Sequence, residues 1–483
     1  MASDAAAPTV GADEGWQGLH PASVVVNLVP RTWATLRSAW PLLAAALYGQ
    51  ANGQGLFDLL LISVFFGLAI GNTVVHFLTL RYRLVDGRLE IRSGLLNRQA
   101  RVISADRVQN VEMVRNIFHR MSGLVEVRIE TASGTEIEGM LSALSVDDAQ
   151  HLITALQAAR GDAPTAAEPD AADVLVRNGT SELLWYGATG TRIGAAALLL
   201  GLAYEAMMLR GPVDPEALEA PRTHLGALTA LVVVAAVTGA WLIGLGTALL
   251  RHHWFRLVRS GKGLVAEQGL FTLRRTELRL SKVQLVTIVE PWLRRAFGFG
   301  SVWVETAAAR EGGDGTQRSE AAVPYVEQQA YRAVVGAAVP LDGLDPADLV
   351  LLPPHPATMT RAILLALVRS AFIVGIAVAW FRLWGLLALL VVPVSVFFAV
   401  LDVRTQGFLV TDALVVARRG WLDRRTSLLA RGKLQSASVD QGPLLRALGL
   451  SLVHLRVAGS RVVLPALAHA DAVALLHRLV RAR

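Results

Sequence analysis

Arginine pairs recur at comparable places in this chain, and they are the side chains best suited to bind an anion. They are Arg98 with Arg101, Arg274 with Arg275, and Arg424 with Arg425. A guanidinium group binds phosphate oxygens through two parallel hydrogen bonds, and basic clusters at a membrane surface bind anionic headgroups. The pairs are therefore candidate contacts to lipid headgroups or to a protein partner. The alternative is that they are ordinary positive charges flanking membrane helices, which is the commoner case.

A second set of polar residues stands at equal offsets in three segments that align without a gap. The segments are Gly94–Gly123, Gly269–Gly298 and Gly420–Gly449. The repeated positions are Gly94, Gln109, Arg120, Gly123, Gly269, Gln284, Arg295, Gly298, Gly420, Gln435, Arg446 and Gly449. They could form a repeated binding site. Equal spacing inside a repeated fold is first explained by structure, because a buried amide or guanidinium ties down a turn through backbone groups. We therefore interpret them as fold positions.

Motifs for enzyme chemistry are missing from the sequence. It has no cysteine, which excludes disulfides and thiolate catalysis. Gly312-Gly313-Asp314-Gly315 lacks the strand-to-helix context of a phosphate loop. His20 and His355 each begin a His-Pro-Ala motif, but one histidine per unit is a weak metal signal, and proline fits a helix start. We expect no enzyme activity, no cofactor and no metal site.

These residues are embedded in an unusually apolar chain, with 53% hydrophobic residues and a net charge of +7. Leu225–Leu250 holds 26 residues without a charge, more than the roughly 20 needed to cross a bilayer. Six such helices are predicted, in three pairs: Trp33–Tyr48 with Leu59–Leu80, Ile193–Leu209 with Leu225–Leu250, and Ala362–Phe381 with Leu383–Leu401. Each pair precedes one repeated segment.

The positions of the basic residues predict the orientation. The links within each pair are short and poor in positive charge, whereas the other helix ends carry arginines such as Arg81, Arg251 and Arg404. Positive residues favour the cytoplasmic side, so both termini and the soluble modules are expected there. Arg37 and Arg369 lie inside predicted spans and could snorkel to the inner interface. An ion or substrate pathway lined by arginines is the alternative.

The soluble segments have strand patterns. Tyr82–Arg92 alternates apolar and polar residues around Asp86-Gly87, a strong hairpin signal. Val125–Glu130 alternates clearly, as in a sheet buried on one face. Aliphatic residues at helical spacing predict a closing helix in every copy, over Asp147–Ala159, Val326–Val335 and His469–Val480. Each copy is thus a compact β domain capped by one helix.

The Gly-Leu turns, the basic-aliphatic-Gln triplet, the Arg-x-x-Gly corner and the flanking helix pairs resemble the bacterial pleckstrin-homology-like, membrane-flanked domain family, a domain of unknown function. The resemblance covers nearly the whole chain. It implies two near-orthogonal antiparallel sheets closed at one end by a C-terminal helix. The expected fold is six transmembrane helices in three hairpins, each followed by a cytoplasmic PH-like β domain with a C-terminal helix.

The repeat gives these boundaries: tail and interfacial segment 1–30, hairpin 31–80, PH-like domain 81–160, linker and interfacial segment 161–190, hairpin 191–250, PH-like domain 251–340, linker and interfacial segment 341–361, hairpin 362–402 and PH-like domain 403–483. The stretch after each His-Pro-Ala motif could lie along the inner leaflet. It could instead be a simple extension of the following helix.

A fold does not name a function. We expect a non-enzymatic protein of the plasma membrane, multi-pass, with its modules acting as a scaffold for protein, peptide or lipid-headgroup binding. Envelope maintenance or stress response is a process that it could serve. The expected partners are the lipid bilayer, anionic headgroups or another membrane protein of the same family, without nucleic acid. A transporter or channel component is the alternative, although the helices lack the regular ionisable residues of a pathway.

Overall fold

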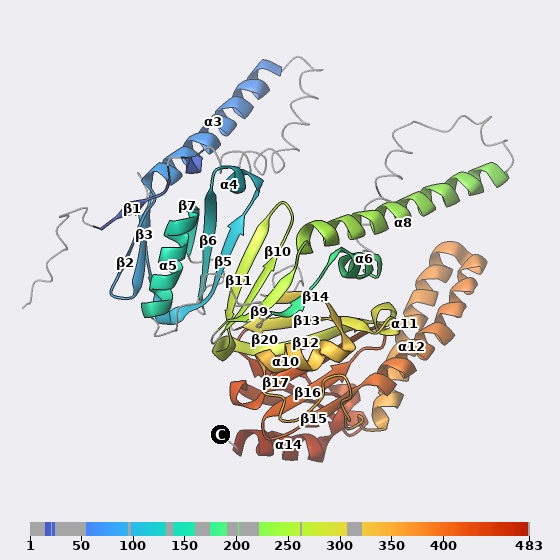
Figure 1. Cartoon of the computed structure of the whole chain (residues 1–483). Helices are drawn as coiled ribbons and strands as arrows, with labels where there is room; N and C mark the ends of the chain where they lie inside the picture. The colour runs from blue at the N-terminus through green and yellow to red at the C-terminus, as the bar shows by residue number, and fades with distance from the viewer. Residues whose placement is uncertain are drawn as a thin grey trace, which may run out of the picture. The chain divides into compact units, whose positions relative to one another are not determined.

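A computed structural model describes residues 15–20, 22–24, 55–94, 98–131, 139–159, 174–190, 201, 222–260, 263–306 and 321–481. The chain divides into two compact units, Met1–Ala167 and Glu168–Arg483. The first unit holds one repeated module and the second unit holds two. Figure 1 shows that each module combines short antiparallel strands with a C-terminal helix.

Module 1 begins after helix α3 (Gly55–Thr79). Its first sheet has the order β1-β2-β3-β4, and its later strands β5, β6 and β7 pair in sequence. The bounds are β1 Gln17–Gly18, β2 Arg81–Val85, β3 Arg88–Ser93, β4 Gln99–Ser104, β5 Val108–Arg115, α4 Ile117–Met121, β6 Leu124–Thr131, β7 Gly139–Ser145 and α5 Val146–Ala159. Asp86 and Gly87 join β2 to β3 with φ of 49° and 70°, the left-handed turn that an Asp-Gly pair favours.

Module 2 takes one strand from before helices α6 (Thr180–Ala188) and α8 (Arg222–His252), and its other elements follow them. Its elements are β8 Val174–Arg177, β9 Arg256–Ser260, β10 Gly263–Gln268, β11 Leu273–Arg279, β12 Val283–Pro291, α9 Trp292–Ala296, β13 Phe299–Thr306, β14 Ala321–Glu327 and α10 Tyr331–Ala338. The predicted closing helix over Val326–Val335 therefore starts too early. The β-branched and aromatic run ending at Val326 continues as strand β14, and the helix begins only at Tyr331.

Module 3 follows helix α11 (Ala357–Phe381), the 3₁₀ segment η6 (Arg382–Leu390) and α12 (Val391–Thr405). Its elements are β15 Gly407–Val410, β16 Leu414–Arg419, β17 Asp423–Ala430, β18 Ser436–Asp440, α13 Pro443–Ala447, β19 Leu450–Val457, β20 Ser460–Val463, β21 Leu467–Ala468 and α14 His469–Arg481. The observed helix α14 agrees with the predicted one to within one residue.

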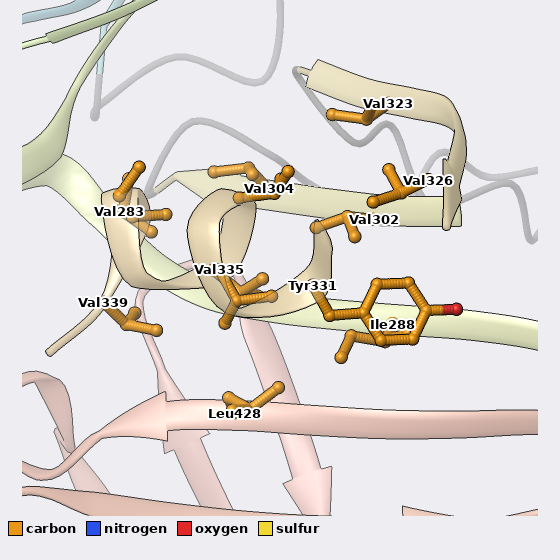
Figure 2. Close-up of a cluster of buried hydrophobic side chains, with 14 of the residues drawn as sticks. Val283, Ile288, Val302, Val304, Val323, Val326, Tyr331, Val335, Val339 and Leu428 are labelled. Atoms are coloured by element: carbon orange, nitrogen blue, oxygen red, sulfur yellow. The ribbon is translucent and has the colours of Figure 1, made fainter. Parts of the chain in front are cut away.

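Modules 2 and 3 share a sheet and a core. The sheet has the strand order β14-β13-β12-β17-β16-β15. Figure 2 shows the core beneath it, where Leu428 of β17 lies with Ile288 of β12 and Val302 of β13. All three side chains are at most 1% exposed. Since a residue of module 3 completes the core of module 2, these two modules fold against each other.

The prediction of six transmembrane helices is wrong. Within the described residues, two segments are long and apolar enough to cross a membrane, Leu231–His252 and Ala357–Thr405. The two spans predicted for the third pair belong to one 49-residue helical segment that includes η6. In α3, the fully described apolar stretch is Ser63–Thr79, which is shorter than a span. The helix predicted over Trp33–Tyr48 lies outside the described residues, and so does the one over Ile193–Leu209 except for Gly201.

The His-Pro-Ala motifs cap helix starts. The Nδ1 atom of His355 accepts a hydrogen bond from the backbone N–H of Ala357 at 3.2 Å, and His20 does the same for Ala22. In the third unit the following residues continue directly into α11. This agrees with the helix-extension interpretation of that segment.

Candidate functional site: a module junction beside a helical groove

The junction between modules 2 and 3 is a strand pair. β12 and β17 run antiparallel, in register from Val286 opposite Leu428 to Pro291 opposite Asp423. One residue further, the N–H of Trp292 donates to the carbonyl of Leu422 at 2.7 Å. Each strand thus forms hydrogen bonds with backbone groups of the other strand that would be exposed to solvent at a sheet edge.

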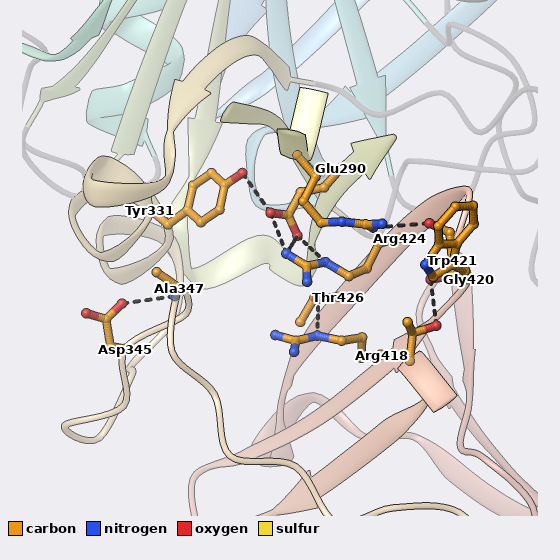
Figure 3. A network of polar contacts seen from close by, with 11 residues as sticks. Glu290, Tyr331, Asp345, Ala347, Arg418, Gly420, Trp421, Arg424 and Thr426 are labelled. Atoms are coloured by element: carbon orange, nitrogen blue, oxygen red, sulfur yellow. Dashed lines mark hydrogen bonds and ion pairs between the residues drawn. The ribbon is translucent and has the colours of Figure 1, made fainter. Parts of the chain in front are cut away.

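An ion pair closes the end of this strand pair (Figure 3). Arg424 donates from Nε and Nη2 to the two carboxylate oxygens of Glu290, at 2.9 and 2.8 Å. The Glu290 side chain is only 3% exposed. Tyr331 donates its hydroxyl to the same carboxylate at 3.3 Å. Burial first, and then the Glu290 charge, raise the pKa of Tyr331 well above its usual value.

The turn between β16 and β17 is held from two sides. Arg295 of α9 donates from Nη1 to the carbonyl of Trp421 at 3.1 Å and lies 5.9 Å from the centre of its ring. Thr405, the last residue of α12, donates to the carbonyl of Gly420 at 3.2 Å. Gly420 has φ of 83°, and an added Cβ would lie 2.3 Å from the Asp423 carbonyl oxygen. Only glycine fits this turn without distortion.

Further polar contacts cross the same junction away from the turn. Ser460 of module 3 donates to Glu305 of β13, and Lys433 donates to the carbonyl of Ser281. Glu305 is 2% exposed, and burial raises the pKa of its carboxyl group, partly opposed by the Ser460 hydrogen bond. The junction therefore combines an apolar core with buried carboxylates.

Beside the turn lies a groove between α11 and α12, which pack side by side (Figure 1). Its volume is about 710 Å³. Four of the α11 residues that line it are spaced by four and form one stripe: Arg361, Leu365, Arg369 and Ile373. The groove thus alternates cationic and apolar side chains along one wall.

The opposite wall carries the groove's carboxylates. Asp402 of α12 lines it and accepts from Gln406 at 2.8 Å, and Asp423 lines it at the foot of β17. Asp423 Oδ2 accepts from Arg425 at 2.8 Å, while its Oδ1 is buried without a partner among the described residues. Phe398 continues this wall with apolar surface. The arrangement can bind a group that carries both charges next to an apolar chain.

The six candidate contact arginines lie in different surroundings. Arg424 is committed to Glu290, and Arg425 pairs with Asp423 and lies 5.7 Å from the Trp303 ring centre. Arg274 and Arg275 lie in β11, where Arg275 pairs with Glu267 at 3.5 Å. Arg101 lies in β4 and Arg98 just before it, both exposed. In module 3 the pair thus builds the junction.

The repeated glycines share one backbone conformation. Gly94, Gly269 and Gly420 have φ of 94°, 115° and 83°, and Gly123, Gly298 and Gly449 have φ of 67°, 75° and 67°. These are left-handed values that favour glycine. In each copy the second glycine closely follows a five-residue helix, α4, α9 or α13.

The repeated polar residues differ between copies. Gln284 is buried and donates to the Lys282 carbonyl at 3.1 Å, whereas Gln435 is exposed and uses its backbone N–H to reach Arg456. The side chain of Gln109 lies outside the described residues. Arg295 holds the junction turn, while Arg120 and Arg446 are exposed.

Sequence reasoning missed Glu290, Trp421 and the groove carboxylates. Glu290 and Arg424 are 134 residues apart in the sequence, so no local pattern joins them. One signal was present: the position of Glu290 in the repeat is Arg115 in the first copy and Gln441 in the third. A position that differs among copies marks a contact that the copies do not share.

The comparisons with known proteins agree with the threefold architecture. The profile of a family described as "Bacterial PH domain" matches residues 38–160, 196–335 and 361–483. The chain is similar to the UPF0699 transmembrane protein YdbT of Bacillus subtilis (strain 168), with 22% identity over 446 residues. The alignment covers 88% of this chain and 89% of that protein. No solved structure matches the chain.

Proposed function

The chain belongs to the bacterial PH domain family, and we propose that it is a membrane-anchored scaffold rather than an enzyme. The observation that carries this proposal is the shared sheet between modules 2 and 3, clamped by Arg424 and Glu290. This ion pair between Arg424 and Glu290, here called the clamp, holds module 3 against module 2. A fixed pair of modules offers one continuous surface, as a scaffold needs.

Membrane anchoring is supported by the two apolar segments. α8 is directly followed by module 2, and α12 by module 3, so a bilayer around these helices would lie next to both modules. The exposed side chains of Phe372, Trp380 and Trp384 in the second segment suit a lipid environment. The Bacillus subtilis relative is named a transmembrane protein.

We place the modules on the cytoplasmic side of the plasma membrane. The ends of the apolar segments that adjoin the modules carry Arg251, Arg361 and Arg404, and positive residues favour the cytoplasm. A reporter fused after Arg483 that is active only in the cytoplasm should be active in intact cells. If instead only a reporter that must be exported to function is active at this position, the modules lie on the outer side of the membrane.

The partners we propose are the bilayer and another membrane protein of the same family. The test compares proximity labelling by the full chain with labelling by Glu290→Gln and Arg424→Gln variants, in cells. The wild type should label a reproducible set of membrane proteins, and the variants should lose most of that set while remaining in the carbonate-washed membrane fraction. Arg446→Gln is the control, because Arg446 is an exposed arginine of module 3 outside the ion pair.

Two outcomes would contradict the scaffold. The first is a chain that leaves the membrane on carbonate washing. The second is an unchanged set of labelled proteins when the clamp is broken and the two modules are shown to separate.

A further inference from the structure

The groove between α11 and α12 carries charges of both signs and an apolar wall, and only Asp423 among these charges pairs with a residue of the junction, Arg425. Within the described residues neither Arg361 nor Arg369 forms an ion pair, and Arg369 donates only to the carbonyl of Leu365, at 3.3 Å. Asp423 keeps one buried oxygen without a partner among those residues. A buried acceptor without a donor indicates a missing ligand or water.

The charges are ordered along the groove. Arg361 and Arg369 are eight residues apart on α11, or about 12 Å along the axis. Long helical side chains lean toward the N-terminus, so Arg369 leans toward Arg361. The carboxylates of Asp402 and Asp423 lie at the end of the groove nearest module 3, and Ile373 lies at the other end of the α11 stripe. Arg361 lies at the module 3 end as well, near the start of α11, and the α11 stripe then runs outward through Leu365, Arg369 and Ile373.

We propose that this groove binds a zwitterionic phospholipid of the phosphatidylethanolamine type. Its ammonium would donate to the carboxylates of Asp402 and Asp423, its phosphate diester would accept from Arg361 and Arg369, and one acyl chain would lie along Leu365, Ile373 and Phe398. The lining charges, two guanidinium groups and two carboxylates, match a headgroup with one charge of each sign. The headgroup of an anionic lipid such as phosphatidylglycerol has no ammonium, so it would leave the two carboxylates without a cationic partner.

The inference rests on the proposed membrane anchoring, and its experiment separates the two. Full-length protein is purified in a non-ionic detergent and titrated with dioleoyl phosphatidylethanolamine or dioleoyl phosphatidylglycerol, and bound lipid is counted by native mass spectrometry. We expect one phosphatidylethanolamine per chain, bound at least about fivefold more tightly than phosphatidylglycerol.

Three variants localise the site. Arg369→Gln should weaken both lipids about tenfold, since it removes a charge-assisted bond to phosphate. Asp402→Asn should remove the preference for phosphatidylethanolamine and leave phosphatidylglycerol binding intact. Arg404→Gln is the matched control on the same helix pair, because Arg404 does not line the groove, and it should bind as the wild type does.

Circular dichroism and melting temperature establish that each variant is folded. Equal affinity for the two lipids in the wild type, unchanged binding by folded Arg369→Gln and Asp402→Asn, or no bound lipid at all would each overturn the proposal. A chain that resists carbonate washing but fails this titration would retain its membrane anchoring and lose only the lipid site.

Discussion

β12 of module 2 and β18 of module 3 occupy the same place in the repeated unit, yet one is joined to a neighbouring module and the other ends a sheet. β12 has nine residues, eight of them buried, whereas β18 has five that alternate between exposed and half-buried. β12 lies between β13 and β17, while β18 is paired only with β19 among the described strands. The same pattern thus produced an interior strand and an edge strand.

The residues that differ explain the contrast. Glu290 corresponds to Gln441, which cannot form an ion pair with an arginine, and Trp292 corresponds to Pro443. Proline has no N–H, so it cannot donate the bond that Trp292 gives to Leu422. Pro443 instead begins helix α13, and proline beside an edge strand discourages further pairing. The comparison indicates that positions which vary among the copies decide where modules join.

The largest expected effect comes from removing the clamp. Arg424→Ala should lower the free energy of unfolding by about 3 kcal/mol, because it leaves the Glu290 carboxylate buried without its partner. Urea unfolding of the detergent-solubilised chain measures this, with Arg446→Ala as the control expected to stay within about 0.5 kcal/mol. A loss below about 1 kcal/mol for Arg424→Ala would remove the clamp from the account.

The second largest loss of stability is expected at the repeated glycine of the junction turn, compared with another repeated glycine of module 3. Gly420→Ala should cost more than about 2 kcal/mol, because positive φ and a close approach of the Asp423 carbonyl act together. Gly449→Ala has no atom within 4 Å of the added Cβ and should cost only about 1 kcal/mol. Thermal unfolding of both variants measures the difference, and equal losses would show that the junction turn is no more constrained than the turn at Gly449.

A smaller effect depends on pH. Burial raises the pKa of Glu305 in the folded chain, so folding favours its protonated form. The stability from this proton is fully present below the unfolded pKa of about 4.3 and is lost as pH rises through the folded value. Glu305→Gln should therefore be more stable than the wild type at pH 8, and the difference should shrink as pH falls. A difference that does not change between pH 8 and pH 4 would contradict this.

The smallest loss of stability is expected from the repeated arginine, which lies at the junction in module 2 and at an exposed position in module 1. Arg295→Ala should cost about 1 kcal/mol by losing the hydrogen bond to the Trp421 carbonyl. Arg120→Ala, at the equivalent exposed position in module 1, should cost about half of that or less. Chemical denaturation compares the two, and a larger loss at Arg120 would reverse the assignment of the repeated arginine to the junction.

Sequence reasoning predicted what is local and repeated. The Asp86-Gly87 hairpin, the alternating strand over Val125–Glu130 and the terminal helix from His469 depend on residues close in the chain, and the structure has all three. The three modules followed from gapless repetition. These features need no knowledge of distant contacts.

Sequence reasoning failed where the structure depends on contacts between distant residues or on the lengths of helices. Hydropathy marked six apolar segments, but it cannot tell that the third pair forms one helical segment. The Glu290 and Arg424 pair joins two copies that look alike in sequence. The groove depends on packing between α11 and α12, which gives Arg361 and Arg369 a shared surface with Asp402.

Hydrogen exchange at single-residue resolution, on the full chain in detergent, tests the shared sheet most directly. If β12 is an interior strand, the amides from Val286 to Glu290 should all be strongly protected, together with those of β17. In β18, from Ala437 to Asp440, the amides that face away from β19 should exchange orders of magnitude faster. Equal exchange rates in β12 and β18 would contradict the shared sheet. So would an Arg424→Ala variant in which the β17 amides lose their protection while the β12 amides keep theirs.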